Sequence, residues 1–257
     1  MKRTIMLLAF CIICQIAAFG QTKYELDVKN TDGTETVFNV EDIKRVYFRE
    51  RNDGGGTSGG GGTETHGEAI DLGLPSGTLW ASYNVGATKP EEYGGYYAWG
   101  ETEEKESYSW STYKWCNGTY ITLTKYCSNS EYGTVDNKTE LDLEDDVAHV
   151  RWGGNWRMPT IDDVKELLDN TKSEWTIIND VKGCKFTSKT NGNSIFLPAA
   201  GYVWEAEWDG VGSYGLYWTS IRDDNWRFAQ VLYFNSGGAY TNKRESRHYG
   251  IPVRPVR

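Results

Sequence analysis

The chain has 257 residues, which is enough for one ordinary domain with a sizeable core and smaller attachments but too few for two large domains. Its formal net charge of −9 disfavours bulk binding to nucleic acid. Basic side chains nevertheless gather near the C-terminus, where residues 222–257 carry seven Lys or Arg against three Asp or Glu. We therefore expect no nucleic-acid partner, and at this basic end either a recognition surface or an ordinary solvated charged surface.

The first twenty residues have the pattern of a secretory signal peptide. Lys2 and Arg3 precede an apolar run at 5–16, and a small-x-small sequence ends at Gly20. No later stretch approaches the roughly 20 apolar residues of a membrane span. We expect residues 1–20 to be removed from an exported protein that is extracellular, on the cell surface or associated with the outer membrane. Nearby cysteines leave lipid anchoring as an alternative.

A small β unit is expected at residues 21–52. The segments YELDV (24–28) and TVFNV (36–40) alternate apolar and polar residues, and an Asp-Gly turn lies between them. About thirty residues bury too little surface to be stable alone, so this unit should dock on the main domain or pair its strands with another chain. The Gly-rich residues 53–67 that follow are predicted to be a flexible linker.

Residues 68–257 are predicted to form a single, mainly β domain. All eleven tryptophans lie there, among short strand-like runs separated by Gly, Asn, Ser and Asp. The strongest helix signal follows Thr160, a good N-cap, because acidic residues fill the first turn and an apolar stripe runs behind them. A weaker helix is expected to begin at Pro90. The predicted class is α+β with few helices.

Three cysteines lie beyond the signal sequence, namely Cys116, Cys127 and Cys184. An odd count in an oxidising compartment leaves one thiol over. We expect a disulfide between Cys116 and Cys127 that closes a hairpin, although sequence spacing cannot fix the connectivity. Cys184 has no histidine near it in the sequence that would activate its thiol.

Six stretches of the last domain together resemble the Fibrobacter succinogenes major paralogous domain, a family of secreted bacterial domains. The resemblance covers essentially all of residues 68–257 and implies a C-type-lectin-like fold, with two short helices around irregular antiparallel sheet and with adjacent first and last strands. The matching stretches are DLGLPSGTLWASYNVGA (71–87), YGGYYAWGET (93–102), LEDDVAHVRWGGNWRMPT (143–160), GNSIFLPAAGY (192–202), LYWTSI (216–221) and GIPVRPVR (250–257).

Most of the matching residues are expected to be structural. Aromatic side chains supply large apolar areas to a domain with few Leu and Ile residues. Asp145 and Asp146, which precede Arg157, suggest a buried ion pair or a cap and not a catalytic dyad, because adjacent side chains point apart. The tryptophans expected in the core are Trp80, Trp99, Trp152, Trp156 and Trp218.

An enzymatic function is the less favoured alternative. The segment WRMPTIDDVKELL resembles a helix of the formylglycine-generating oxidases, which share the C-type-lectin-like fold and need a cysteine pair in the C-terminal half. Here only Cys184 follows Gly183, and no Ser-His-Asp, HExxH, CxxC or P-loop pattern replaces that pair. DDNW (223–226) has residue types found in calcium sites but lacks a partner ligand set. We expect no enzyme, no cofactor and no metal.

The favoured function is recognition of an unknown protein or glycan by two terminal loops, RDDNWR (222–227) and YTNKRESRHY (240–249). A rigid β scaffold that presents such loops can vary its contacts without disturbing its core, and the side-chain types are common at interface hot spots. The predicted ligand-binding residues are Arg222, Asp223, Asp224, Asn225, Trp226, Arg227, Tyr240, Asn242, Lys243, Arg244, Glu245, Arg247, His248 and Tyr249.

Two further interpretations stay open. The ending VRPV resembles that of some C-type-lectin-like targets of diversity-generating retroelements, which would imply diversified loops. Codons for Trp226, Lys243 and Glu245 cannot arise from an all-Asn AAC template, so other template codons would be needed. The alternative to a ligand receptor is a surface adhesin or a structural component of an envelope or pilus-like assembly.

Overall fold

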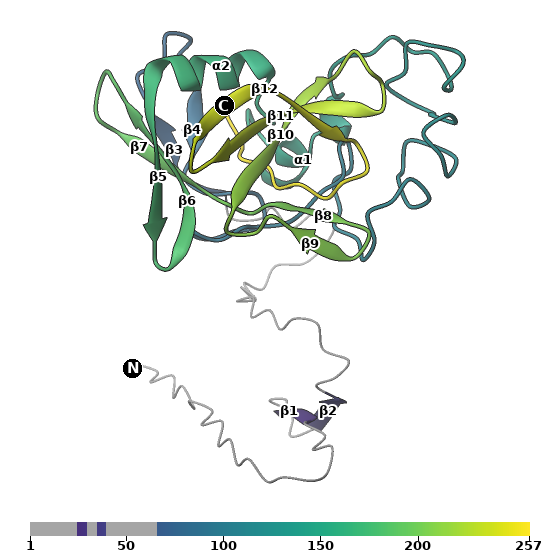
Figure 1. Cartoon of the computed structure of the whole chain (residues 1–257), viewed down its shortest axis with the longest axis horizontal. Coiled ribbons are helices and arrows are strands. Elements are labelled where there is room, and N and C mark those ends of the chain that lie inside the picture. The colour runs from purple at the N-terminus through teal and green to yellow at the C-terminus, as the bar shows by residue number, and fades with distance from the viewer. Residues whose placement is uncertain (1–24, 30–34, 40–65) are drawn as a thin grey trace. The chain divides into compact units, whose positions relative to one another are not determined.

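The computed structural model describes residues 25–29, 35–39 and 66–257 (Figure 1). The expected signal peptide at 1–20 lies outside these residues, and so does the expected linker at 53–67 except for its last two positions. The structure therefore bears on two strands of the small β unit and on the domain that follows.

The chain divides into two compact units, Met1–Gly59 and Gly60–Arg257, which we describe separately. In the first unit, β1 (Glu25–Lys29) pairs antiparallel with β2 (Glu35–Asn39). Both strands coincide with the alternating segments of the sequence, and they form a two-stranded sheet by themselves.

The second unit combines short helices with many strands (Figure 1). Its elements in chain order are β3 (Ala69–Asp71), β4 (Leu79–Ala81), the 3-10 helix η2 (Leu143–Asp145), α1 (Val147–Trp152), α2 (Ile161–Asn170), β5 (Thr171–Ile178), β6 (Val181–Ser188), β7 (Ser194–Pro198), β8 (Tyr202–Trp204), β9 (Glu207–Asp209), β10 (Tyr214–Arg222), β11 (Phe228–Asn235) and β12 (Gly238–Ser246).

Antiparallel sheet dominates this unit, which confirms the predicted α+β class. One sheet has the strand order β10-β11-β12 and another has the order β5-β6-β7, while β3 pairs with β4 and β8 with β9. Neither α1 nor α2 has the length and hydropathy of a membrane-spanning helix, and no other helix among the described residues does.

Helix α2 begins where the sequence predicts. The Thr160 side chain accepts a hydrogen bond from the Asp163 amide at 3.1 Å, and the Asp163 carboxylate accepts one from the Thr160 amide at 2.7 Å, which forms a capping box. Val164 and Leu167 are buried on the inner side of the helix. Arg157 donates to the Asp163 carboxylate at 2.6 Å, so the cap also holds the segment before the helix.

The helix expected at Pro90 is not present, because that segment forms a turn. The Glu92 carboxylate accepts hydrogen bonds from the amides of Thr88 and Lys89 at 2.6 and 3.2 Å, which closes the chain locally. Gly94 then adopts a φ of 74°, outside the helical region. The weak helical pattern is therefore overridden by a side chain that binds the backbone.

Helix α1, which the sequence analysis did not predict, begins at a buried carboxylate. Asp146 accepts hydrogen bonds from the amides of Ala148, His149 and Met158 at 2.9, 3.0 and 2.7 Å. The neighbouring Asp145 accepts from the Lys125 ammonium and the Tyr126 hydroxyl, both at 2.6 Å. Asp146 is thus a helix cap and Asp145 belongs to a buried ion pair, but its partner is Lys125, whereas Arg157 pairs with Asp163.

All five tryptophans expected in the core are buried. Two clusters of buried aromatic and aliphatic residues lie on opposite sides of the β10-β11-β12 sheet. The indole nitrogens of Trp99 and Trp218 donate to the carbonyls of Thr219 and Tyr97, both at 2.8 Å. Each ring thus buries its apolar area while its single donor is satisfied.

The last eight residues run through the middle of the unit. Leu79 and Arg257 exchange two backbone hydrogen bonds of 2.9 Å, and Arg157 and Val256 do the same. The Trp218 amide donates to the Pro252 carbonyl at 3.2 Å. The end of the chain is therefore bonded to the first strands of the domain, to the segment before α2 and to the central sheet.

We expect Trp218→Ala to lower the free energy of unfolding by about 3–5 kcal/mol, because removing the buried indole ring leaves a cavity in the core. The matched control Trp204→Ala, at a ring that is 50 % exposed, should change it by about 0.5 kcal/mol. Chemical denaturation measures both. Equal losses in the two variants would contradict a core role for Trp218.

Candidate functional site

Most of the second predicted loop, residues 240–249, is an edge strand. β12 extends to Ser246 and pairs with β11, with Arg244 opposite Gln230. Two glycines, Gly237 and Gly238, allow the tight hairpin before it. The large polar side chains did not suggest a strand, but an exposed edge strand tolerates charged residues well. Only residues 247–249 form a turn.

Arg247 was predicted to contact a ligand, but it is 0 % exposed. Its guanidinium donates to the Tyr113 hydroxyl at 3.0 Å and to the carbonyls of Trp226, Lys125 and Tyr126 at 3.0, 3.1 and 3.2 Å. Five donors in a planar fork suit such a ring of acceptors. Arg247 therefore joins the turn after β12 to two other loops and is part of the scaffold.

Arg222 and His248 are also buried and are removed from the predicted binding set. Arg222 donates to the Asp223 carbonyl at 2.6 Å and to the Lys138 carbonyl at 3.3 Å. The His248 ring lies 4.7 Å from the Trp110 ring, and burial lowers its pKa to about 4. His248 is therefore neutral at pH 7.

The first predicted loop, residues 222–227, is held by its own side chains. The Asn225 amide donates to the Asp223 carboxylate at 2.9 Å. Trp226 stacks on Tyr132 with ring centroids 3.7 Å apart. The Arg227 guanidinium lies 4.3 Å from the centroid of the Tyr120 ring. These aromatic contacts leave Trp226 and Arg227 only partly exposed.

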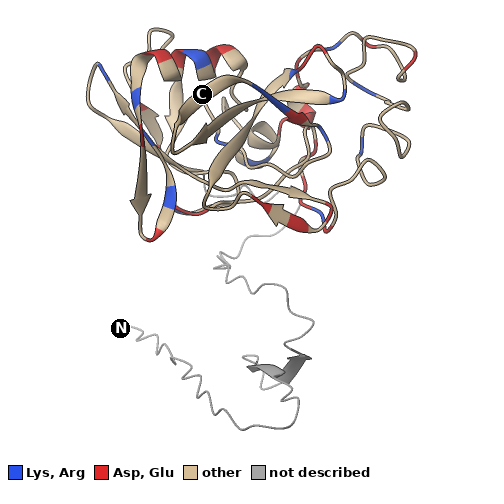
Figure 2. Cartoon of the chain, viewed as in Figure 1, with Lys and Arg blue, Asp and Glu red and all other residues tan. Residues whose placement is uncertain are grey.

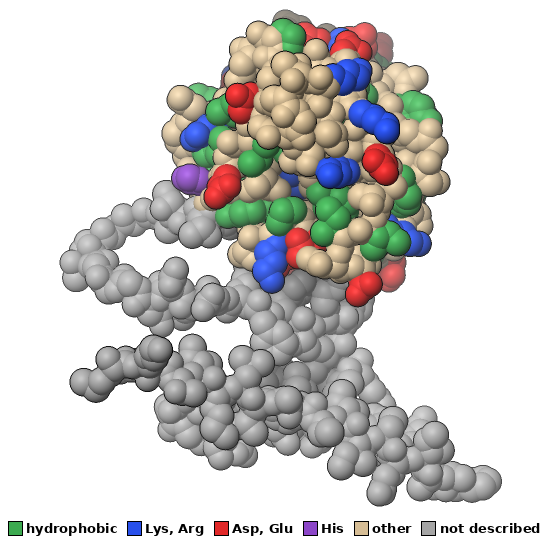
Figure 3. Space-filling model, turned by 90° about the vertical axis from the view of Figure 1, so that its left-hand side faces the viewer, with side chains coloured by type: hydrophobic (Ala, Val, Ile, Leu, Met, Phe, Trp, Pro, Cys, Tyr) green, Lys and Arg blue, Asp and Glu red, His purple; other side chains and the backbone are tan. Residues whose placement is uncertain are grey.

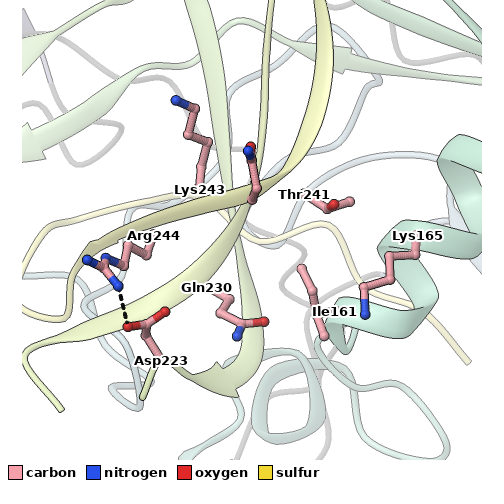
Figure 4. A pocket seen from close by; sticks show the side chains of 8 residues that line it. Ile161, Lys165, Asp223, Gln230, Thr241, Lys243 and Arg244 are labelled. Atoms are coloured by element: carbon pink, nitrogen blue, oxygen red, sulfur yellow. Dashed lines mark hydrogen bonds and ion pairs between the residues drawn. The ribbon is translucent and has the colours of Figure 1, made fainter. Parts of the chain in front are cut away.

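A cleft of about 370 Å³ brings four predicted residues together with four that the sequence analysis missed (Figure 4). It lies between the start of α2, the loop after β10 and the strands β11 and β12. The predicted members are Asp223, Asn242, Lys243 and Arg244. The missed members are Ile161, Lys165, Gln230 and Thr241. Thr241 lies inside the predicted loop 240–249, although it was not among the predicted binding residues. No sequence spacing indicates that α2 and Gln230 lie beside β12, so no signal could have found the other three.

Hydrogen-bonding groups dominate the cleft. Arg244 pairs with the Asp223 carboxylate at 2.9 Å, and the Gln230 side chain reaches between the strands and α2 (Figure 4). The Gln230 Oε1 atom is buried without a hydrogen-bond partner in the described part of the chain. Lys243 points away from Gln230 (Figure 4). The cleft can therefore orient a polar ligand that donates to Gln230.

The remaining predicted residues do not line this cleft. Asp224 and Tyr240 are exposed, whereas Glu245 and Tyr249 are partly exposed. The side of the unit that carries β5, β6 and β7 shows acidic and basic side chains interspersed with hydrophobic ones (Figure 3).

The predicted disulfide between Cys116 and Cys127 is not formed, since both are buried free thiols. The Cys116 thiol donates to the Trp110 carbonyl and the Cys127 thiol to the Asn129 carbonyl, each at 3.1 Å. Each thiol is thus hydrogen-bonded within its own segment of the chain and not paired with the other. Burial raises the pKa of Cys184 to about 12, so its thiol stays protonated and a poor nucleophile at pH 7.

Three carboxylates near η2 lie close enough together to hold a cation, namely Asp142, Glu144 and Asp145. The Lys125 ammonium lies among them, 2.6 Å from Asp142 and Asp145 and 3.6 Å from Glu144. The Lys125 side chain therefore already supplies a cation to these carboxylates.

Residues 163–256 match a family described as a domain of unknown function, DUF8237. The matched part contains β5 to β12 and every cleft residue except Ile161. No curated protein and no solved structure matches the chain.

We expect Arg247→Ala to lower the free energy of unfolding by about 3 kcal/mol or more, because several buried acceptors lose their donor. Arg244→Ala, at an exposed ion pair, should change it by about 0.5 kcal/mol. Thermal and urea unfolding of both variants measure the difference. An unchanged free energy of unfolding in Arg247→Ala would contradict the scaffold role of Arg247 and make it a candidate binding residue again.

Proposed function

We propose that the chain is an exported, non-enzymatic recognition domain that binds an unknown protein or glycan ligand in the cleft between α2, β11 and β12. One observation carries this proposal. The cleft gathers Asp223, Asn242 and Arg244, which the sequence analysis selected, around the buried and unpartnered Gln230 acceptor. A ligand that donates a hydrogen bond there would satisfy a group that is otherwise costly to bury.

The scaffold is proposed to be of the C-type-lectin-like, major paralogous domain type. Three features support this: two short helices, irregular antiparallel sheet, and a last segment bonded to the first strands of the domain. The resemblance of six sequence stretches over residues 68–257 supports the same scaffold. In such an arrangement the end of the chain is anchored while the neighbouring strand presents side chains.

Binding is favoured over catalysis because of the groups that the cleft contains. Amide, hydroxyl and paired ionic groups orient a ligand, whereas nucleophilic catalysis needs an activated nucleophile beside a base. The Cys184 thiol, which is the cysteine in the region where related oxidases carry a pair, is buried and protonated. An oxidase of the formylglycine-generating type is therefore not proposed.

Retroelement diversification, if it operates on this chain, is proposed to act at exposed positions. Substitution of Asn242, Lys243 or Arg244 would leave the hydrogen bonds of β12 to β11 in place, because their side chains are exposed. Substitution of Arg222 or Arg247 would remove buried scaffold contacts. Diversified copies should therefore vary at the first group and retain the second.

A surface adhesin or a component of an envelope or pilus-like assembly is the second candidate. β1 and β2 form a two-stranded sheet, and such a pair is marginally stable without further contacts. Strand addition by another chain would extend it. Cross-linking of the exported protein to its neighbours in the envelope would distinguish assembly from a tethered receptor.

A glycan and protein array probed with the full chain should identify a ligand, and Gln230→Met and Asn242→Ala should each weaken its binding by about tenfold, the effect of losing one buried hydrogen bond. The control Lys172→Ala changes an exposed residue of β5 outside the cleft. Isothermal titration calorimetry measures the affinities. Parental affinity in both cleft variants would rule out the cleft as the binding site.

A further inference from the structure

The face of the β10-β11-β12 sheet opposite the cleft carries a different set of side chains. On β11 and β12, Gln230 and Arg244 are register partners on the cleft side. The adjacent partners Ala229 and Glu245 must point to the other side, because successive side chains of a strand alternate. Glu245 therefore belongs to a second surface that the proposed cleft does not use.

Five tyrosine rings form a continuous row on that surface, which we call the tyrosine face. The ring of Tyr249 lies 4.8 Å from that of Tyr202, which is 6.5 Å from Tyr214. Tyr214 is 5.7 Å from Tyr233, and Tyr233 is 6.0 Å from Tyr240. Four of the rings pack on the core, and Tyr240 is 41 % exposed. The row joins β8, β10, β11 and β12.

Carboxylates line the same face. The register of the β8-β9 hairpin puts Asp209 beside Tyr202 and Glu207 beside the exposed Trp204. Glu207 and Asp209 are both exposed, and acidic residues mark β9 in Figure 2. The Tyr214 hydroxyl donates to the Asp209 carboxylate at 3.2 Å. The hairpin therefore contributes both negative charge and aromatic area.

Glu245 shares this side of the sheet and interacts electrostatically with three tyrosines of the row. Burial raises its pKa to about 7, and the charge of Lys243 opposes that effect. Burial is also the main cause of the raised pKa values of Tyr202, Tyr214 and Tyr249, and the negative charge of Glu245 adds to each. Among the described residues, no donor forms a hydrogen bond to it. A partly desolvated carboxylate without a donor is stabilised by an added cation.

The row already accepts one cation from the chain itself. The Lys243 ammonium lies 5.8 Å from the centroid of the Tyr233 ring. Within the described residues, no such contact is made by the rings of Tyr202, Tyr214 and Tyr249. Aromatic π faces attract ammonium and guanidinium groups, and a nearby carboxylate adds to the attraction.

We propose that the tyrosine face binds the Lys and Arg side chains of a basic segment of a partner protein. The five tyrosine rings and three carboxylates of this face form a negative, aromatic surface on a chain whose net charge is −9. A neutral glycan could contact the rings but would gain nothing from the ionised carboxylates. The partner is thus identified by its positive charge, independently of the ligand of the cleft.

The probe for this surface is a short oligolysine peptide, titrated into the full chain at low ionic strength, with oligoglutamine as the neutral comparison. Isothermal titration calorimetry measures the affinity. Amide substitutions keep the shape of the face and remove its charge, and circular dichroism checks that the fold is retained. The face variant carries Glu207→Gln, Asp209→Asn and Glu245→Gln.

A matched control separates this face from the overall negative charge of the chain. It removes three exposed carboxylates from α2 and β5, and carries Asp162→Asn, Asp169→Asn and Glu174→Gln. We expect the face variant to bind oligolysine about tenfold more weakly than the parent, and the control to change affinity by less than about twofold. Equal weakening in both variants, or no binding by the parent, would overturn the proposal.

The pH dependence supplies a second readout. Oligolysine stays charged near neutrality, so affinity should rise as the pH increases through about 7 and Glu245 ionises. The other charged or titratable groups that interact with this carboxylate are Lys243, Tyr202, Tyr214 and Tyr249. Glu245→Gln alone should flatten the rise. Tighter binding of a neutral β-linked glucose oligosaccharide than of oligolysine would contradict a cationic partner.

Discussion

The hydrogen bonding of the last eight residues to the rest of the domain is the constraint on which its architecture depends. Backbone pairs join Leu79 to Arg257, Arg157 to Val256 and Trp218 to Pro252. These contacts connect the first strands, the segment before α2 and the central sheet through one extended segment. β12 ends shortly before that segment, so its position is set at both ends, by the hairpin from β11 and by the anchored terminus. The surfaces on either face of β12 are therefore presented by a rigid strand.

Buried arginines extend this anchoring. Arg254 is fully buried and donates to the Asn84 side chain at 2.8 Å and to the carbonyls of Ala81 and Phe196 at 3.1 and 2.9 Å. Arg247 is held in the same way by carbonyls and a tyrosine hydroxyl. Carbonyl oxygens solvate each guanidinium, and that of Arg247 also lies 5.0 Å from the centroid of the Trp99 ring. Part of the positive charge near the C-terminus is thus internal scaffold.

The side chains of β12 separate two surfaces of unlike chemistry. On one face, Gln230 and the Asp223–Arg244 pair line a polar cleft beside α2. On the other, Glu245 shares a side of the sheet with the tyrosine row, to which the acidic β8-β9 hairpin contributes Tyr202. An edge strand with one neighbour can present both faces because α2 covers only part of the sheet. Two ligands of different chemistry could be held on a single strand without competing for side chains.

The sequence by itself determined the α+β class, the start of α2 at Thr160 and the tryptophans of the core, because capping patterns and apolar area act locally or through composition. It also selected Asp223, Asn242 and Arg244 for the candidate site. Only the tertiary structure decided that Arg247 is internal, that residues 240–246 form a strand, and that Gln230 and α2 complete the cleft. The sequence shows that a residue is an arginine, but not whether solvent or the carbonyls of distant segments surround its side chain. Its role therefore depends on contacts between segments far apart in the chain, which no local pattern encodes.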